Sequence, residues 1–170
     1  MEQLKSDFEF CHLEDYNSIN FEKSLLWIIN VKSIPPHIGI SSQNKFFSLK
    51  HNGKDEGRDT NFLLSKMIKN GIPVVFSELK MEIELSKIKT CFSDYTRADQ
   101  IQNSCLKPIL DVLNLSGKHQ KISDLLRFLS ASNQITNFYS LNIPTDKVSI
   151  PYYSIEKISE TLRKLSHVER

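Results

Sequence analysis

The chain has 170 residues, of which 39% are hydrophobic and 25% are charged. This size and balance fit one ordinary soluble domain with a hydrophobic core, and they exclude collagen, a long coiled coil and a mostly disordered chain. The formal net charge of +2, from 22 Lys and Arg against 20 Asp and Glu, gives no field that favours a nucleic acid or an acidic membrane. We therefore expect a single domain over residues 1–170 and no nucleic-acid partner, and nothing in the composition indicates an oligomeric state.

The sequence shows no segment typical of membrane insertion or export. No stretch approaches the roughly 20 consecutive apolar residues of a membrane-spanning helix. The first residues, Met1–Lys5, lead into acidic, mixed sequence and not into an apolar block. Cys11, Cys91 and Cys105 are too far apart for a disulfide framework or a metal-binding pair. We expect a protein of the reducing cytoplasm, without a membrane span, a metal or a cofactor.

The first half of the chain predicts a hairpin beside a buried strand. Residues 1–23 mix aromatic and acidic side chains without a sustained period, so we expect an irregular leader there. Residues 25–31 are large and β-branched, which is typical of a buried strand. Residues 37–41 and 46–50 predict two further strands, because a short polar turn separates them.

The middle of the chain predicts one helix between two strands. The charged block 54–59 is expected to be solvated and to lead to Thr60, which can cap a helix that ends at Asn70–Gly71. Residues 72–76 again have strand character, and residues 79–85 alternate between apolar and charged side chains. That alternation is the period of a half-exposed antiparallel strand.

Apolar residues at helical spacing dominate the last third of the chain. They predict helices from Leu106 to Ser116–Gly117, over 122–129 and over 155–165, with 133–151 as a long polar and aromatic connection. The expected fold is α+β, with a mostly antiparallel sheet from 25 to 85 packed against the helix near Cys105. Within the single domain we expect the leader over 1–23, this core over 24–117 and helices over 118–170 that close the other side.

Cys105 is a candidate nucleophile because it directly precedes a predicted helix. Asn103 and Ser104 can accept hydrogen bonds from free amides at a helix start, and Pro108 is tolerated only in the first turn. We therefore expect Cys105 at the cap or the first helical position, where the helix dipole favours a thiolate. In the alternative interpretation, Cys105 shares an apolar face with Ile109 and is a small buried hydrophobic residue.

His37 is a candidate general base, since it begins a strand directly after two prolines that can hold the ring at a fixed angle. With a tight turn at Gln43–Asn44, we expect Ser48 on the returning strand to lie near His37 and to orient the imidazole. His51, at the next turn, is a weaker candidate for this role. In the alternative interpretation, His37 is a structural hydrogen-bond donor and Ser48 a tolerated polar residue.

Three short segments follow one another in an order that is typical of a known enzyme family. They are His37–Ile40, Phe46–Ser48 and Asn103–Leu106. Their order resembles that of the circularly permuted papain-like hydrolases, the NlpC-type peptidases and their lecithin retinol acyltransferase relatives, over about residues 25–115. The resemblance implies a permuted papain-like arrangement with Cys105 as nucleophile, His37 as base and Ser48 as third member. The family usually has histidine or another strongly polar residue at the third site, and an asparagine adjacent to the cysteine, where this chain has Ser104.

No other pattern predicts chemistry with comparable weight. His12 beside Cys11 lacks a second pair of ligands at the spacing of a zinc site, and the chain has no glycine-rich phosphate loop. The basic residues of the last two helices have the pattern of solvated helix faces. These features leave the thiol and the imidazole as the candidate chemistry.

Two functional hypotheses from different classes therefore remain. The first is a cysteine-dependent hydrolase or acyltransferase that acts on an amide or ester, a peptide included. The second is a non-catalytic module that binds a protein partner through exposed aromatic residues. Its candidate residues are Phe138, Tyr139, Tyr152 and Tyr153. The first hypothesis requires that Cys105 and His37 meet in space.

Overall fold

The computed structural model describes residues 5–99 and 103–168 and has an α+β fold with 32% helix and 30% strand. Its centre is a seven-stranded sheet in the order β2-β8-β7-β3-β4-β5-β6, antiparallel except for the β2–β8 pair. In chain order these strands are β2 (Glu14–Asp15), β3 (Leu25–Ile29), β4 (His37–Ser42), β5 (Lys45–Lys50), β6 (Gly53–Asp59), β7 (Val74–Leu79) and β8 (Ile135–Leu141). The α+β class and the mostly antiparallel sheet are confirmed.

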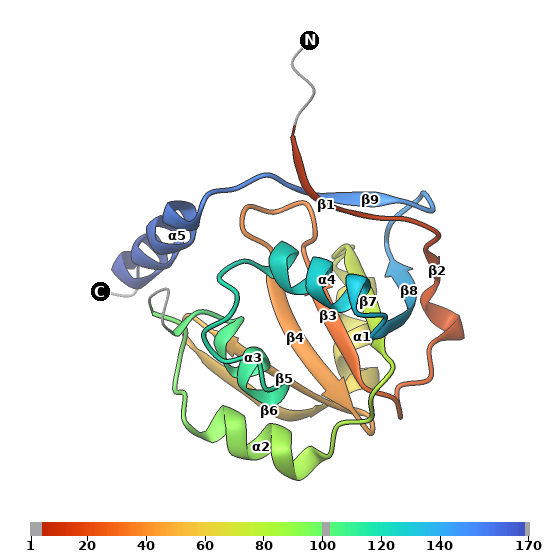
Figure 1. The fold of residues 1–170 in the computed structure, drawn as a ribbon, viewed down its shortest axis with the longest axis horizontal. Coiled ribbons are helices and arrows are strands. Elements are labelled where there is room, and N and C mark those ends of the chain that lie inside the picture. The colour runs from red at the N-terminus through yellow and green to blue at the C-terminus, as the bar shows by residue number, and fades with distance from the viewer. Residues whose placement is uncertain (1–4, 100–102, 169–170) are drawn as a thin grey trace.

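Helices cover both faces of the sheet. On one face lie α2 (Leu85–Ser93), α3 (Lys107–Val112) and α4 (Ile122–Ala131), and on the other lies α1 (Thr60–Lys69) (Figure 1). Strand β3 contacts both layers of helices, since all five of its residues are buried. Leu26 and Ile28 belong to the core under α2 to α4, and the other three residues belong to the core under α1. A strand buried on both faces has a continuous apolar sequence, and this is the pattern of β3.

The hairpin of β4 and β5 has the predicted two-residue turn. Gln43 and Asn44 both have positive φ, of 50° and 61°, as a tight hairpin turn with the twist of the flanking strands requires. The predicted helix that begins at Thr60 is α1, although its N-cap is the preceding residue, Asp59, whose carboxylate accepts from the Phe62 N–H at 3.2 Å. The strand predicted over 72–76 is β7, and the helix predicted over 122–129 is α4.

The irregular or edge-packed leader predicted over 1–23, of which residues 1–4 lie outside the described residues, contains two strands, and the connection predicted over 133–151 is wrong. β1 (Ser6–Phe10) pairs antiparallel with β9 (Val148–Pro151), and β8 joins the main sheet. Phe10 is fully buried. Short strands with mixed side chains are stabilised by partners that lie far away in sequence, so their own period is weak.

Two further expectations about strands are wrong. The block 54–59 belongs to β6, an edge strand whose charged residues pair with one another and whose Asp55 is buried. The strand predicted over 79–85 ends at Leu79, and helix α2 starts at Leu85. Between them the Ile83 N–H donates to the Ser24 hydroxyl at 2.9 Å, so the alternating side chains lie in an irregular segment.

The helices after residue 118 do not close the other side of the sheet. Leu125 and Leu129 of α4 pack in the same core as Ile109 of α3, and α5 (Ile155–Val168) places Ile158 in that core too. The opposite face is covered by α1 because Leu63, Leu64 and Met67 form its apolar stripe. Within the described residues no helix is long and apolar enough to cross a membrane.

Gly39 of β4 is required for close packing in the hairpin. A Cβ atom built on Gly39 would lie 2.3 Å from Cζ of Phe46 and 3.0 Å from the Phe47 carbonyl oxygen. Gly39→Ala should therefore lower the free energy of unfolding by about 1–3 kcal/mol, measured by urea denaturation. In the double variant with Phe46→Leu the loss should be smaller than the sum of the single losses, since the ring that causes the clash is gone. Wild-type stability in Gly39→Ala would contradict this packing.

Candidate functional site

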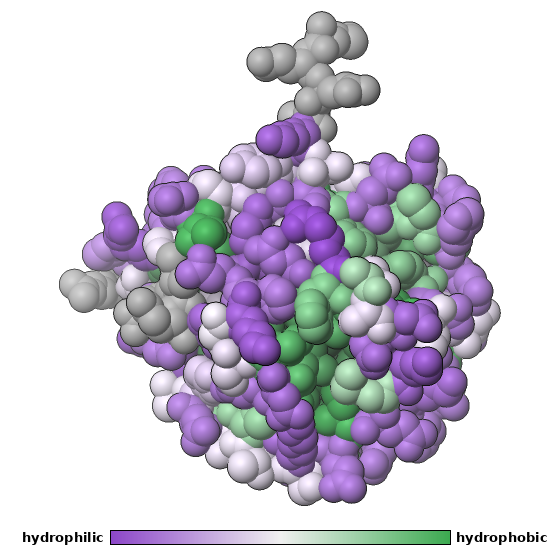
Figure 2. Space-filling view, in the orientation of Figure 1, coloured by the Kyte–Doolittle hydropathy of each residue, from purple (hydrophilic) through white to green (hydrophobic). Residues whose placement is uncertain are grey.

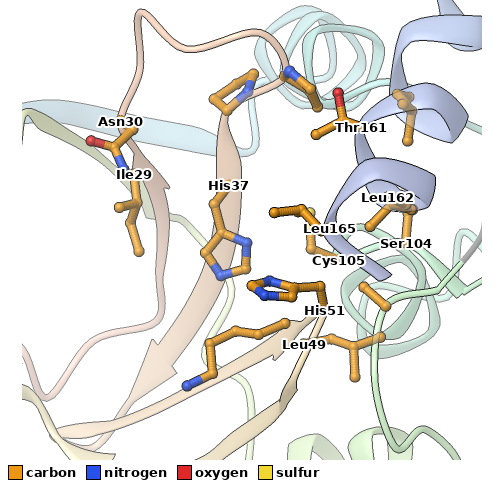
Figure 3. Close-up of a pocket in the computed structure, with 15 residues that line it drawn as sticks. Ile29, Asn30, His37, Leu49, His51, Ser104, Cys105, Thr161, Leu162 and Leu165 are labelled. Atoms are coloured by element: carbon orange, nitrogen blue, oxygen red, sulfur yellow. The ribbon is translucent and has the colours of Figure 1, made fainter. Parts of the chain in front are cut away.

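A cavity of about 320 Å³ lies where the start of β4, the end of β5, the turn before α3 and helix α5 meet (Figure 3). Most of its wall is apolar. This part of the wall includes Ile29, Pro35, Leu49, Ile158, Leu162 and Leu165. His37, His51 and Cys105 line the same cavity (Figure 3). The structure thus brings the predicted nucleophile and the predicted base to one site.

Cys105 lies near the start of β4. The backbone N–H of Ile38, the residue after His37, is one of the groups that lower the pKa of its thiol. The backbone N–H groups of Cys105 and Leu106 also face this sulfur. Three donors around one thiol are an arrangement that would stabilise negative charge on sulfur or on an oxygen bound next to it.

Burial nevertheless raises the pKa of Cys105 above its ordinary value, against the opposing effect of these N–H groups. The resting side chain is therefore a thiol at neutral pH. Cys105 was predicted at the cap or the first helical position, and this is wrong, because Cys105 lies in a turn one residue before the N-cap Leu106 and α3 begins at Lys107. Pro108 lies in the first turn, as predicted.

His37 begins β4 and pairs with Ile29 of β3. Its Nε2 is buried and has no hydrogen-bond partner among the described residues. Burial lowers the pKa of His37 to about 4, with smaller effects from Asp55, which raises it, and from Lys50 and His51, which lower it. The imidazole is therefore neutral at pH 7 and can accept a proton.

Ser48 does not occupy the predicted position beside His37. Its hydroxyl donates to Oδ2 of Asp55 at 3.0 Å, and Ser48 is not part of the cavity wall. In the register of the hairpin, Ile40 pairs with Phe47. Continued along the strands, this register places His37 opposite Lys50 and Ser48 opposite Gly39, so Ser48 lies on the same face as His37, as predicted, but two residues from the position opposite it. Its hydroxyl is bound to Asp55 and not to Nε2 of His37, so the expected orienting contact to this atom is not present.

His51, the weaker candidate in the sequence, lines the cavity together with His37. It follows the end of β5, and the hairpin register brings that end beside the start of β4, where His37 lies. Its ring faces the cavity between His37 and Leu49 (Figure 3). The turn at Gln43–Asn44 already implied this pairing, since a two-residue turn fixes which residues lie opposite one another.

The aromatic residues of the alternative hypothesis are mostly structural. Tyr139 and Tyr153 are only 4% and 3% exposed, and Phe138 packs edge-on against Phe10 with ring centroids 5.3 Å apart. Tyr152 alone of the four has a largely exposed ring. Two of the four residues are thus buried and Phe138 is half-buried, so the expected binding surface is reduced mainly to Tyr152.

The chain matches no protein-family model, and neither the comparison with curated proteins nor that with solved structures finds a match. In the part of the chain that the structure describes, no group of three or more His, Cys, Asp or Glu side chains could hold a metal ion. Function therefore has to be argued from the cavity and its side chains.

The burial of neutral His37 makes stability depend on pH. The unfolded imidazole has a pKa of 6.5 and the folded one about 4, so between these values protons bind the unfolded chain preferentially. The contribution of neutral His37 to the free energy of unfolding is present above pH 6.5 and is lost as the pH falls towards 4. The free energy of unfolding should fall by about 2 kcal/mol more in the wild type than in His37→Gln between pH 7 and pH 5. Equal losses in urea denaturation of both proteins would show that His37 is not buried in neutral form.

Proposed function

We propose that the protein is a cysteine-dependent hydrolase or acyltransferase that acts on an ester or amide with an apolar acyl group. The observation that carries the proposal is that Cys105 and His37 line one cavity whose other walls are mostly apolar. Apolar walls favour an apolar acyl group, and a thiol beside an imidazole is the arrangement that acyl transfer requires.

In the proposed reaction the His37 imidazole takes the Sγ proton of Cys105 while the sulfur attacks the carbonyl carbon. The C–S bond forms, and the carbonyl electron pair moves to oxygen. When the tetrahedral intermediate collapses, the imidazolium returns the proton to the leaving alcohol or amine, and a thioester remains. Water or an acceptor alcohol then attacks the thioester, His37 takes its proton and returns it to the sulfur, and the acid or the new ester leaves.

The oxyanion of the intermediate would bind at the backbone N–H groups before α3. Those of Cys105 and Leu106 already face the sulfur, so an oxygen on the attacked carbon comes close to them. This positioning supports acyl transfer over a purely structural role for the thiol.

The resting pair is a thiol and a neutral imidazole, because burial raises the pKa of Cys105 and lowers that of His37. Catalysis then depends on His37 as a general base and not on a preformed thiolate. We assign the orienting role to His51, which lines the cavity, in place of Ser48. A histidine in this role agrees with the resemblance to the permuted papain-like hydrolases, which the sequence motifs support. All three cysteines are free, as suits the reducing cytoplasm that we propose as the compartment.

The first test uses p-nitrophenyl esters of increasing acyl length. The wild type should release p-nitrophenol and carry the acyl group on Cys105, detected by peptide mass spectrometry. Cys105→Ala should remove both signals, and His37→Gln should lower kcat/KM by about 100-fold or more. From acetate to butyrate, kcat/KM should rise about fourfold per methylene, because the apolar wall takes up the added groups.

The pH dependence of kcat/KM distinguishes a neutral pair of Cys105 thiol and His37 imidazole from a thiolate–imidazolium ion pair. With His37 as a neutral base of pKa about 4, the acid limb of kcat/KM should lie near pH 4 and not near pH 6.5. An acyl adduct on Cys11 or Cys91 in place of Cys105 would exclude the proposed nucleophile. Full activity in His37→Gln would exclude the proposed base.

A second test separates His51 from Ser48. His51→Gln should lower kcat/KM by about tenfold or more, since the imidazole of His37 loses the neighbour that orients it. Ser48→Ala removes the buried hydrogen bond to Asp55 and should cost about 1 kcal/mol of stability, with kcat/KM within about threefold of wild type. A larger effect of Ser48→Ala than of His51→Gln on kcat/KM would reverse the assignment.

A further inference from the structure

The cavity beside Cys105 offers a ligand mainly apolar side chains, and the face of the molecule in Figure 2 is by contrast mostly hydrophilic. The apolar residues come from the end of β5, from the segment before α3 and from α5 (Ile155–Val168), and they include Leu49, Ala98, Ile158, Leu162 and Leu165 (Figure 3). Leu49 is fully buried, and Ala98 is 4% exposed. The Ala98 N–H donates to the Lys50 carbonyl at 2.8 Å, which joins the segment before α3 to the end of β5. A bound alkyl group therefore contacts three separate parts of the protein.

The cavity wall also contains a buried polar atom that can bind a ligand. Nε2 of His37 has no hydrogen-bond partner among the described residues. A buried nitrogen without a partner costs free energy, which a hydrogen bond to a ligand or to a water molecule recovers. The ring of His37 lies beside that of His51 in the cavity wall (Figure 3). His37 is therefore the place where the cavity can bind a polar group.

The cavity is poorly suited to a charged group. Apart from the histidines, Lys50 is the residue of the described wall with a full charge at neutral pH, and its Nζ lies 3.3 Å from Oδ1 of Asp55. The Arg58 Nε donates to the same oxygen at 2.9 Å. A ligand carboxylate would compete with Asp55 for Lys50, and the described wall includes no Asp or Glu that could bind an ammonium group. Burial without an opposite charge disfavours an ion, so an uncharged ligand fits best.

The volume of the cavity limits the length of the ligand. An apolar protein cavity of about 150 Å³ holds one benzene molecule. On this scale the cavity of about 320 Å³ has room for roughly twelve non-hydrogen atoms. This is the size of an alkyl chain of about eight to ten carbons with a small polar group. Methylenes beyond this length stay in water and add no affinity.

We propose that the cavity binds an uncharged, single-chain amphiphile of about eight to ten carbons, with its polar group at His37 and its alkyl chain against Leu49, Leu162 and Leu165. Medium-chain alcohols, amides and esters belong to this class. As a substrate the ligand is a medium-chain ester or amide, and this part of the inference rests on the proposed function. The binding itself needs no reaction at Cys105.

The first test measures the binding of straight-chain alcohols to the wild type by isothermal titration calorimetry. From hexan-1-ol to octan-1-ol the dissociation constant should fall about fourfold per methylene, because each added group leaves water. Beyond decan-1-ol it should stay constant within about twofold. Octanoate and octylammonium at pH 7 should bind at least about tenfold more weakly than octan-1-ol, since burial of an ion without a partner is costly.

Two further measurements test whether the alcohols bind in the cavity. Saturating octan-1-ol should slow labelling of Cys105 by N-ethylmaleimide by about tenfold and leave that of the exposed Cys11 unchanged, as followed by peptide mass spectrometry. Leu162→Trp fills part of the cavity and should weaken binding of decan-1-ol by about tenfold, with hexan-1-ol changed less than about threefold. The control Arg163→Trp places the same ring at an exposed position outside the wall and should leave both dissociation constants unchanged.

Equal affinity for octanoate and octan-1-ol would overturn the uncharged ligand class. A dissociation constant that does not change with chain length, or that Arg163→Trp raises as much as Leu162→Trp does, would show that the alcohols bind elsewhere. Binding that depends on chain length in a protein without esterase activity would keep this inference and remove the proposed function. Ester hydrolysis without binding of the alcohols would remove this inference alone, so the two failures are distinguishable.

Discussion

The approach of the Ile38 N–H to the Cys105 thiol, whose pKa it lowers, brings together two parts of the chain that are far apart in sequence. The turn before α3 and the first residues of β4 thereby line one cavity. His37 lies one residue from the donor, and the sheet holds it through its pairing with Ile29. The core around Ile109 and Leu110 holds α3 in turn, since both residues are fully buried. His37 therefore lies on a strand of the sheet, and Cys105 lies in the turn that leads into the buried helix α3.

Burial determines the electrostatic character of this site more than any charged neighbour does. It is the largest cause of both pKa shifts, upward for Cys105 and downward for His37, and both shifts favour the uncharged form. Asp55 acts in the opposite direction on His37, but Ser48, Lys50 and Arg58 already surround its carboxylate. A pair that rests uncharged in an apolar cavity avoids the cost of buried charge until a substrate brings polar groups into it.

Local signals were sufficient to predict the elements that depend on their own sequence. The continuous apolar run of β3, the turn at Gln43–Asn44 and the helical stripe of α4 each combine side-chain pattern with turn or cap residues. The missed strands β1 and β9 depend instead on each other, and a single mixed segment carries little trace of a partner so far away. The same limit applied to the site. Cys105 and His37 were chosen by residue type and position, and they line one cavity, whereas the place of His51 in the same cavity depends on which strand ends the hairpin register brings together.

The pairing of β1 with β9 also affects how the chain assembles during synthesis. Glu9 and Ser149, which pair in the two-stranded sheet of β1 and β9, are 140 residues apart in sequence. A ribosome releases the N-terminal segment first, so the aromatic side chains of β1 stay without their partner strand until β9 has left the exit tunnel. Contacts of such long range close late and slowly. The two-stranded sheet of β1 and β9 should therefore be the last part of the sheet structure to form on a nascent chain. Phe10 would be accessible to a chaperone for most of translation.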